Sequence, residues 1–204
     1  MIGIIDYKVG NIQAFLNVFK KLDVEAFSIS SPDQVDQADK LILPGVGHFD
    51  FAMSKFLESG LKTKVEQRVL IDGVPVLGVC VGMQMLANTS EEGNMPGLGW
   101  IPGEVKRFTL KDVKTKPHVP HMGWNTVRNI KNHPILEGLD ETASFYFLHS
   151  FYFSCEEDKD RLLLTQYGIE YTSMAHRNNV FGAQFHPEKS HSAGVQLLKN
   201  FSEI

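Results

Sequence analysis

The sequence predicts an α/β fold built on a mostly parallel sheet. Between residues 2 and 88, short apolar runs typical of buried strands alternate with segments whose apolar residues recur every three or four positions. The strand-like runs cover residues 2–5, 24–29, 41–43 and 74–80. Because strands that alternate with helices build βαβ units, these runs are expected to lie parallel in one sheet. Their carboxyl ends then share one edge, which is where such sheets bind ligands.

Helices are expected between these strands. The first opens after Gly10-Asn11, and apolar side chains recur at helical spacing through residue 22. Ser31-Pro32-Asp33 is a helix-start signal. Further helices are predicted over residues 49–57, 61–71 and 83–88, and Leu57 is expected on the apolar face of the first of these.

The second half of the chain has a different pattern. Residues 91–103 are rich in glycine and proline and predict turns. Short strands that add an antiparallel part to the sheet are predicted over residues 117–127, 144–155, 161–167, 171–175 and 180–185. A helix over residues 191–201 closes the chain. Since no linker, low-complexity segment or repeat interrupts residues 1–204, a single domain is expected.

Composition excludes several classes of protein. The net charge of -4 gives no electrostatic footprint for nucleic acid. No apolar run approaches 18 residues, and residues 1–6 lack the basic start of a signal peptide, so neither a membrane span nor secretion is expected. Cys80 and Cys155 are too few for a disulfide framework, which favours the reducing cytoplasm.

One cysteine lies where a nucleophile is expected. The strand-like run ends in Gly78-Val79-Cys80-Val81-Gly82, and a helical pattern follows. Small residues on both sides of a reactive side chain at a strand-to-helix junction are typical of a nucleophile elbow. The first helical N–H groups behind the sulfur would favour the thiolate. The alternative is an ordinary buried cysteine at a strand end.

A base and a group to orient it occur after another strand. His186 follows the apolar run 180–185, and Glu188 comes two residues later, after Pro187. A histidine can take a thiol proton and return it to a leaving amine, while a carboxylate fixes its tautomer. The alternative is a surface histidine. A metal site at His118 and His121 is the weaker hypothesis, since the sequence has no Cys-x-x-Cys or His-Glu-x-x-His.

A third motif follows the third predicted strand. Pro44-Gly45-Val46-Gly47 offers backbone N–H groups at the same sheet edge, and such donors stabilise an oxyanion. It is not a phosphate-binding P-loop, because no Gly-Lys-Ser/Thr follows. The alternative is a plain glycine-rich turn.

These three motifs together resemble the signatures of class I, triad-type glutamine amidotransferases. Within that class the chain resembles the glutaminase subunits of imidazole glycerol phosphate synthases, from histidine biosynthesis. The motifs closest to that subfamily are residues 5–7, 10–11, 97–100, 120–125 and 145–150. The resemblance covers nearly the whole chain and implies a flavodoxin-like open sheet flanked by helices.

The resemblance also implies a reaction. Cys80 attacks the side-chain amide of L-glutamine, His186 relays the proton and Glu188 orients His186. Glutamate and ammonia are released through a thioester, without cofactor or metal. The resemblance places the oxyanion donors at Gly45, Val46, Gly47 and Val81, and the glutamine-binding residues at Gln84, Glu92 and Ser150.

The implied partner is a (β/α)8-barrel cyclase subunit in a heterodimer. It uses the ammonia to make imidazole glycerol phosphate and an aminoimidazole carboxamide nucleotide (AICAR). The resemblance places Met122, Trp124, Asn125 and Lys189 at the partner surface, with residues 122–125 as a turn. Trp124 has the alternative of filling the core. The resemblance implies almost no glutaminase activity until the partner is loaded. Residues 45–47 have the backbone freedom for a peptide flip that would activate the site.

Some segments depart from the commonest pattern, namely Lys8-Val9, residues 172–177 and residues 190–194. His191 resembles paralogues that supply ammonia for acetamidino-sugar formation in surface-polysaccharide biosynthesis, and this is the second hypothesis. A related cysteine peptidase is disfavoured by Gln84 and Glu92. A scaffold without activity is disfavoured by the complete set of Cys80, His186 and Glu188.

Overall fold

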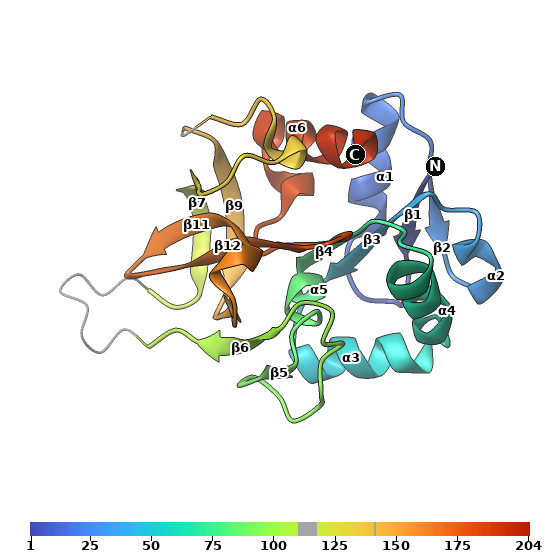
Figure 1. The fold of residues 1–204 in the computed structure, drawn as a ribbon, viewed down its shortest axis with the longest axis horizontal. Coiled ribbons are helices and arrows are strands. Elements are labelled where there is room, and N and C mark those ends of the chain that lie inside the picture. Colours follow the sequence, from blue (N-terminus) through green and yellow to red (C-terminus); the bar gives the residue numbers. More distant parts are fainter. Residues whose placement is uncertain (110–117, 141) are drawn as a thin grey trace.

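A large twisted sheet runs through the molecule and is covered by helices on both faces (Figure 1). The computed structural model describes residues 1–109, 118–140 and 142–204. The strand order is β2-β1-β3-β4-β13-β12-β10-β6-β5, and β11 and β8 extend the sheet from β12.

The first five strands in this order are parallel. They are β2 (Ala26–Ile29), β1 (Ile2–Ile5), β3 (Lys40–Gly45), β4 (Val76–Cys80) and β13 (Val180–Ala183). This was predicted for the four from the first half of the chain. The strand over residues 180–185 was expected in the antiparallel part, and that prediction was wrong, because this strand pairs in parallel with the strand that ends at Cys80. The strands β1, β4 and β13 are buried throughout. Strands buried on both faces read as continuous apolar runs, which is why the sequence pattern identified them.

The rest of the sheet is mainly antiparallel, which was also predicted. It contains β12 (Ile169–Arg177), β11 (Arg161–Tyr167), β10 (Phe151–Cys155), β6 (Gly103–Arg107), β8 (Arg128–Asn129) and β5 (Thr89–Ser90). β7 (His121–Thr126) and β9 (Ser144–His149) pair with each other as a separate ribbon. Residue 117, the predicted start of the strand before residue 127, lies outside the described residues.

Helices cover the two faces of the sheet (Figure 1). α1 (Ile12–Lys21) and α6 (His191–Glu203) lie on one face, and α3 (Phe49–Glu58), α4 (Lys62–Glu66) and α5 (Val81–Gln84) on the other. α2 (Pro32–Val35) follows β2, and a π-helical turn over Gln67–Ile71 continues α4. Short 3-10 turns cover Pro134–Leu136, Asp158–Asp160 and Pro187–Lys189. No helix of the described residues has the length and apolar character needed to cross a bilayer.

Several predicted boundaries were wrong. The helix expected over residues 83–88 starts at Val81 and ends at Gln84, because the carbonyl groups of Met85 and Leu86 accept hydrogen bonds from residues 98 and 101 instead. The strand at 41–43 continues to Gly45. Leu57 was expected on an apolar face but is 45% exposed.

The predicted strand over residues 144–155 is two strands in different sheets. β9 pairs with β7, whereas β10 pairs with β6 and β12. The break falls at Ser150, where the ring of His149 bonds to the carbonyl group of Phe151 and the chain changes direction.

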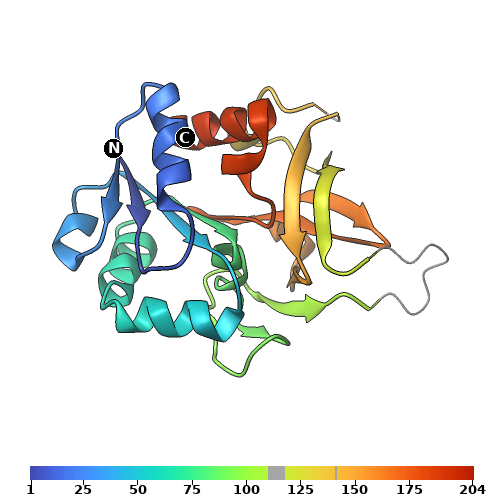
Figure 2. The same ribbon diagram turned by 180° about the vertical axis from the view of Figure 1, so that it is seen from behind.

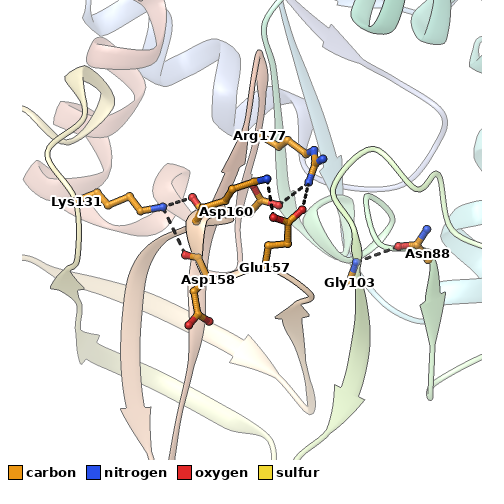
Figure 3. A network of polar contacts seen from close by, with 8 residues as sticks. Asn88, Gly103, Lys131, Glu157, Asp158, Asp160 and Arg177 are labelled. Carbon is orange, nitrogen blue, oxygen red and sulfur yellow. Dashed lines mark hydrogen bonds and ion pairs between the residues drawn. The ribbon is translucent and has the colours of Figure 1, made fainter.

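An ion-pair cluster fixes the sheet edge opposite to Cys80 (Figure 3). Arg177, at the end of β12, donates to Asp160 at 2.9 Å and to Glu157 at 3.2 Å. Asp160 is almost fully buried, so this pairing also neutralises a buried carboxylate. Since Arg177 pairs with the amino end of β13, the cluster supports the sheet and not the carboxyl-end site.

Candidate active site

Cys80 lies in a strained turn between β4 and α5. Its φ of 55° is in the left-handed region, which non-glycine residues seldom adopt. A Cβ atom at Gly82 would lie 1.9 Å from the carbonyl oxygen of Leu43, and one at Gly78 would lie 2.6 Å from that of Gly82. The predicted tight turn is therefore present, and only glycine fits at these two flanking positions.

The three motifs meet at one sheet edge, as expected. β4 lies between β3 and β13, with Gly45 in register with Cys80 and Ala183 in register with Val79. His186 follows β13 by three residues. The hydroxyl group of Tyr7 donates to the carbonyl oxygen of Pro44 at 2.6 Å and fixes the end of β3.

His186 and Glu188 form a buried pair beside Cys80. His186 Nδ1 lies 2.8 Å from Glu188 Oε1, and both side chains are 3% exposed. Burial lowers the pKa of His186, but hydrogen bonds with Cys80 and Glu188 raise it overall to about 10. A protonated His186 beside the sulfur of Cys80 is the arrangement that a cysteine nucleophile requires.

A cavity of about 330 Å³ opens in front of Cys80. Its lining includes the residues that sequence reasoning assigned to the oxyanion and to glutamine: Val46, Gly47, Val81, Gln84, Glu92 and Ser150. Gly45 is not part of the lining. It ends β3 and packs so closely that a Cβ there would lie 2.5 Å from the backbone nitrogen of Gly82.

Gln84 and Glu92 are held in place by the protein itself. Gln84 is 3% exposed, and its Nε2 donates to the carbonyl oxygen of Phe151 at 3.0 Å. Glu92 Oε2 accepts from the backbone nitrogen of Phe49 at 2.9 Å, at the start of α3. Both side chains therefore enter the cavity wall with their positions already fixed.

Sequence reasoning missed part of the cavity. Pro120, Leu148, His149 and Phe151 also line it. Buried Gln184 is not part of the lining, but its Nε2 lies 3.9 Å from Cys80 Sγ. His149 is neutral, since burial lowers its pKa to about 3. The available signal for Gln184 was one polar residue inside the apolar run 180–185.

The residues assigned to the partner surface do not all face the same way. Met122 and Trp124 are 65% and 48% exposed on β7, and Lys189 is exposed. The prediction of a turn over residues 122–125 was wrong, because these residues are part of β7. Side chains alternate along a strand, so Asn125 lies on the other face, where it bonds to His121 and to the carbonyl oxygen of Gln166.

The exposed position of Trp124 also rules out the core-filling alternative. Its ring stacks on His191 with an interplanar angle of 2°. His121, half of the suggested metal pair, is buried and bonds to Tyr171 at 3.0 Å. Among the described residues no cluster of three or more metal-ligating side chains occurs.

Comparisons with known proteins agree with this geometry. The family model described as Glutamine amidotransferase class-I matches residues 3–204. The chain is 50% identical to a Bdellovibrio bacteriovorus protein and 47% identical to a Leptospira interrogans protein, both named imidazole glycerol phosphate synthase subunit HisH. It is 49% identical to a Pseudomonas aeruginosa protein named imidazole glycerol phosphate synthase subunit HisH 2. All three alignments cover 100% of both chains.

Solved structures support the fold. A structure titled glutamine amidotransferase aligns with a TM-score of 0.75 at 20% identity, covering 99% of this chain and 97% of the other. The structure of PurLQS from Thermotoga maritima aligns with a TM-score of 0.74 at 15% identity, with the same coverage.

Proposed function

The chain belongs to the class I glutamine amidotransferase family, and from this premise we propose that it is the glutaminase subunit of an imidazole glycerol phosphate synthase in histidine biosynthesis. It hydrolyses L-glutamine to glutamate and ammonia. The observation that carries this proposal is the buried His186–Glu188 pair at 2.8 Å, with His186 and Cys80 both in the lining of a cavity large enough for an amino acid.

In the first half of the reaction, Cys80 Sγ attacks the carboxamide carbon of glutamine. The backbone N–H groups of Val46, Gly47 and Val81 are the proposed donors to the oxyanion. Val81 starts α5, and the first N–H groups of a helix have no partner within the helix. His186 then gives its proton to the leaving nitrogen, so that ammonia departs and a glutamyl thioester remains.

In the second half, water replaces ammonia. Neutral His186 takes a proton from the water, whose oxygen attacks the thioester carbon, and the thiolate leaves as glutamate forms. Glu188 keeps the Nδ1–H of His186 directed toward itself, so that Nε2 faces the sulfur.

The ammonia is passed to a second subunit. We place a (β/α)8-barrel cyclase on the face that carries Met122 and Trp124, where Leu148, opposite Met122 in the β7–β9 ribbon, is also an exposed apolar side chain. Val46 is a further exposed apolar side chain. Val46 and Leu148 line the cavity as well, so this face surrounds the exit from the site. The complex works in the cytoplasm, where free cysteines such as Cys80 and Cys155 stay reduced.

A second candidate shares the glutaminase chemistry but has another acceptor. The name HisH 2 on the Pseudomonas aeruginosa relative indicates more than one such chain in that organism. An extra copy is free to supply ammonia elsewhere, for example to acetamidino-sugar formation. Rescue of a histidine auxotroph that lacks this subunit, with the cognate cyclase co-expressed, separates the two candidates, and failure to rescue favours the second.

The test of the chemistry is Cys80→Ala in the complex with the cyclase. Glutamine-dependent synthesis is expected to disappear, while synthesis from added ammonium salt continues. Cys155→Ala removes the other free cysteine and serves as the matched control, with both activities retained. Glutamine hydrolysis that survives Cys80→Ala would contradict the assignment.

A further inference from the structure

Gln184 lies between the nucleophile and Gln84. Its side chain is fully buried, and its backbone nitrogen donates to the carbonyl oxygen of Ser173 at 2.9 Å. One end of its side-chain amide lies 3.1 Å from Gln84 Nε2 and the other lies 3.9 Å from Cys80 Sγ. The chemical effect on the sulfur depends on which end of the amide faces it.

The surrounding bonds determine that orientation. The carbonyl oxygen of Phe151 can only accept, so the atom of Gln84 that lies 3.0 Å from it must be the amide nitrogen. The same nitrogen contacts the amide of Gln184, which must therefore present its oxygen to Gln84. The nitrogen of Gln184 is left facing Cys80, so the sulfur receives a donor.

His149 closes the other side of this network. Its Nδ1 lies 2.7 Å from the carbonyl oxygen of Phe151, and its Nε2 lies 3.1 Å from the hydroxyl group of Tyr171. A neutral imidazole has one N–H, which must point at the carbonyl, so the hydroxyl group of Tyr171 donates to Nε2. Both lone pairs of the Phe151 oxygen are then in use, and neither amide can reverse without losing a buried hydrogen bond.

We propose that Gln184 is a positioning residue that donates an N–H to the Cys80 sulfur and favours the thiolate before glutamine arrives. A thiolate accepts such a bond more strongly than a thiol, because hydrogen bonds to ionised groups are the stronger ones. Gln184 thereby couples Gln84, in the cavity wall, to the nucleophile. The titratable groups that act on the same sulfur are His186, after β13, and Tyr7, after β1, and the carbonyl oxygen of Leu148 lies 3.9 Å from it. All three stay in place in the variants below, so a difference between them reports the Gln184 donor. The role of this coupling in glutamine hydrolysis rests on the proposed function, but the effect on the sulfur does not.

The experiment measures how fast iodoacetamide alkylates Cys80 between pH 5 and 10, followed by mass spectrometry of the peptide that contains it. Gln184→Met keeps an unbranched side chain and removes the donor. The midpoint of its alkylation profile is expected to move up by about one pH unit, which is about a tenfold slower reaction below the midpoint. Ser173→Ala alters the neighbouring buried hydroxyl group, not the donor, and its profile is expected to match that of the unmodified chain.

A Gln184→Met profile that coincides with that of the unmodified chain overturns the proposal, and so does an equal shift in Ser173→Ala. If Gln184→Met alone fails to fold because Gln84 loses its acceptor, the double variant Gln84→Met/Gln184→Met decides, since it leaves neither amide unpaired. The same upward shift is then expected, and its absence overturns the proposal. Alkylation requires neither glutamine nor the cyclase, so a chain without glutaminase activity contradicts the proposed function and leaves this test intact.

Discussion

His186 and Glu188 are separated by one proline, and their side chains meet at 2.8 Å in a place closed to solvent. Pro187 starts the short turn Pro187–Lys189, whose geometry brings the carboxylate back to the ring two residues earlier. The second carboxylate oxygen, Oε2, is buried and has no hydrogen-bond partner among the described residues. Among the described residues, the carboxylate of Glu188 therefore makes its side-chain hydrogen bond to His186 alone.

Glu188→Gln is expected to lower kcat for glutamine hydrolysis by about 10²- to 10⁴-fold while the chain remains folded. An amide in place of the carboxylate no longer holds the imidazolium and also permits the wrong tautomer of His186. Steady-state glutamate release in the cyclase complex measures the effect. Glu58→Gln, at an exposed ion pair on α3, is the matched control and is expected to retain full activity. Equal rates in both variants would remove Glu188 from the mechanism.

Acid is expected to destabilise the fold through two buried neutral histidines. Burial lowers the pKa of His121 to about 4 and that of His149 to about 3. In the unfolded chain both pKa values return to about 6.5. Since the unfolded state binds more protons below pH 6.5, the free energy of unfolding should fall by about 2 kcal/mol per histidine between pH 7 and pH 5. Urea titrations at the two pH values measure this.

His121→Gln should reduce the difference between pH 7 and pH 5 by about 2 kcal/mol, because the titration of His121 is lost. An unchanged difference between pH 7 and pH 5 in this variant would contradict the assignment. His186 acts in the opposite direction. Because its pKa is raised to about 10, His186 makes its full contribution to the free energy of unfolding below pH 6.5, and this contribution is lost as the pH rises toward 10.

Gly82→Ala is expected to cost about 3 kcal/mol or more, or to prevent folding, since its Cβ would lie 1.9 Å from the carbonyl oxygen of Leu43. The comparison is Gly60→Ala, where φ is also positive but nothing lies within 4 Å of the new Cβ. That variant should lose only about 1 kcal/mol, from backbone strain. Urea denaturation gives both values, and similar losses would show that close packing at the elbow is unimportant.

The parallel half of the fold was predictable because strands buried on both faces carry their signal in consecutive residues. The antiparallel half was less so. β6 has one buried aliphatic residue, Val105, among charged neighbours, and β10 on one side with β5 on the other make it a strand. The break between β9 and β10 likewise depends on which partner each half finds, and this is not a local property.

The site shows the same division. Cys80, His186 and Glu188 lie in short motifs whose residue types predict a nucleophile, a base and a group that orients the base. The structure brings the three side chains together. Gln184 and His149 were missed because their meaning depends on contacts with Cys80 and Tyr171, which lie 104 and 22 residues away in the chain. Asn125 shows the opposite error. Its motif placed it at the partner surface, but a motif does not show which face of β7 a side chain occupies.

Trp124→Ala is expected to weaken binding of the proposed cyclase subunit by at least about tenfold, because an exposed tryptophan on a rigid strand is a typical anchor of an interface. Its ring is already fixed against His191, so little conformational entropy is lost on docking. Phe51→Ala is the matched control: it removes an aromatic side chain of similar exposure from α3, distant from β7 in both views (Figures 1 and 2). Isothermal titration calorimetry of each variant with the cyclase measures the dissociation constant. Equal affinities for the two variants would move the interface away from β7, whereas a loss confined to Trp124→Ala places it there.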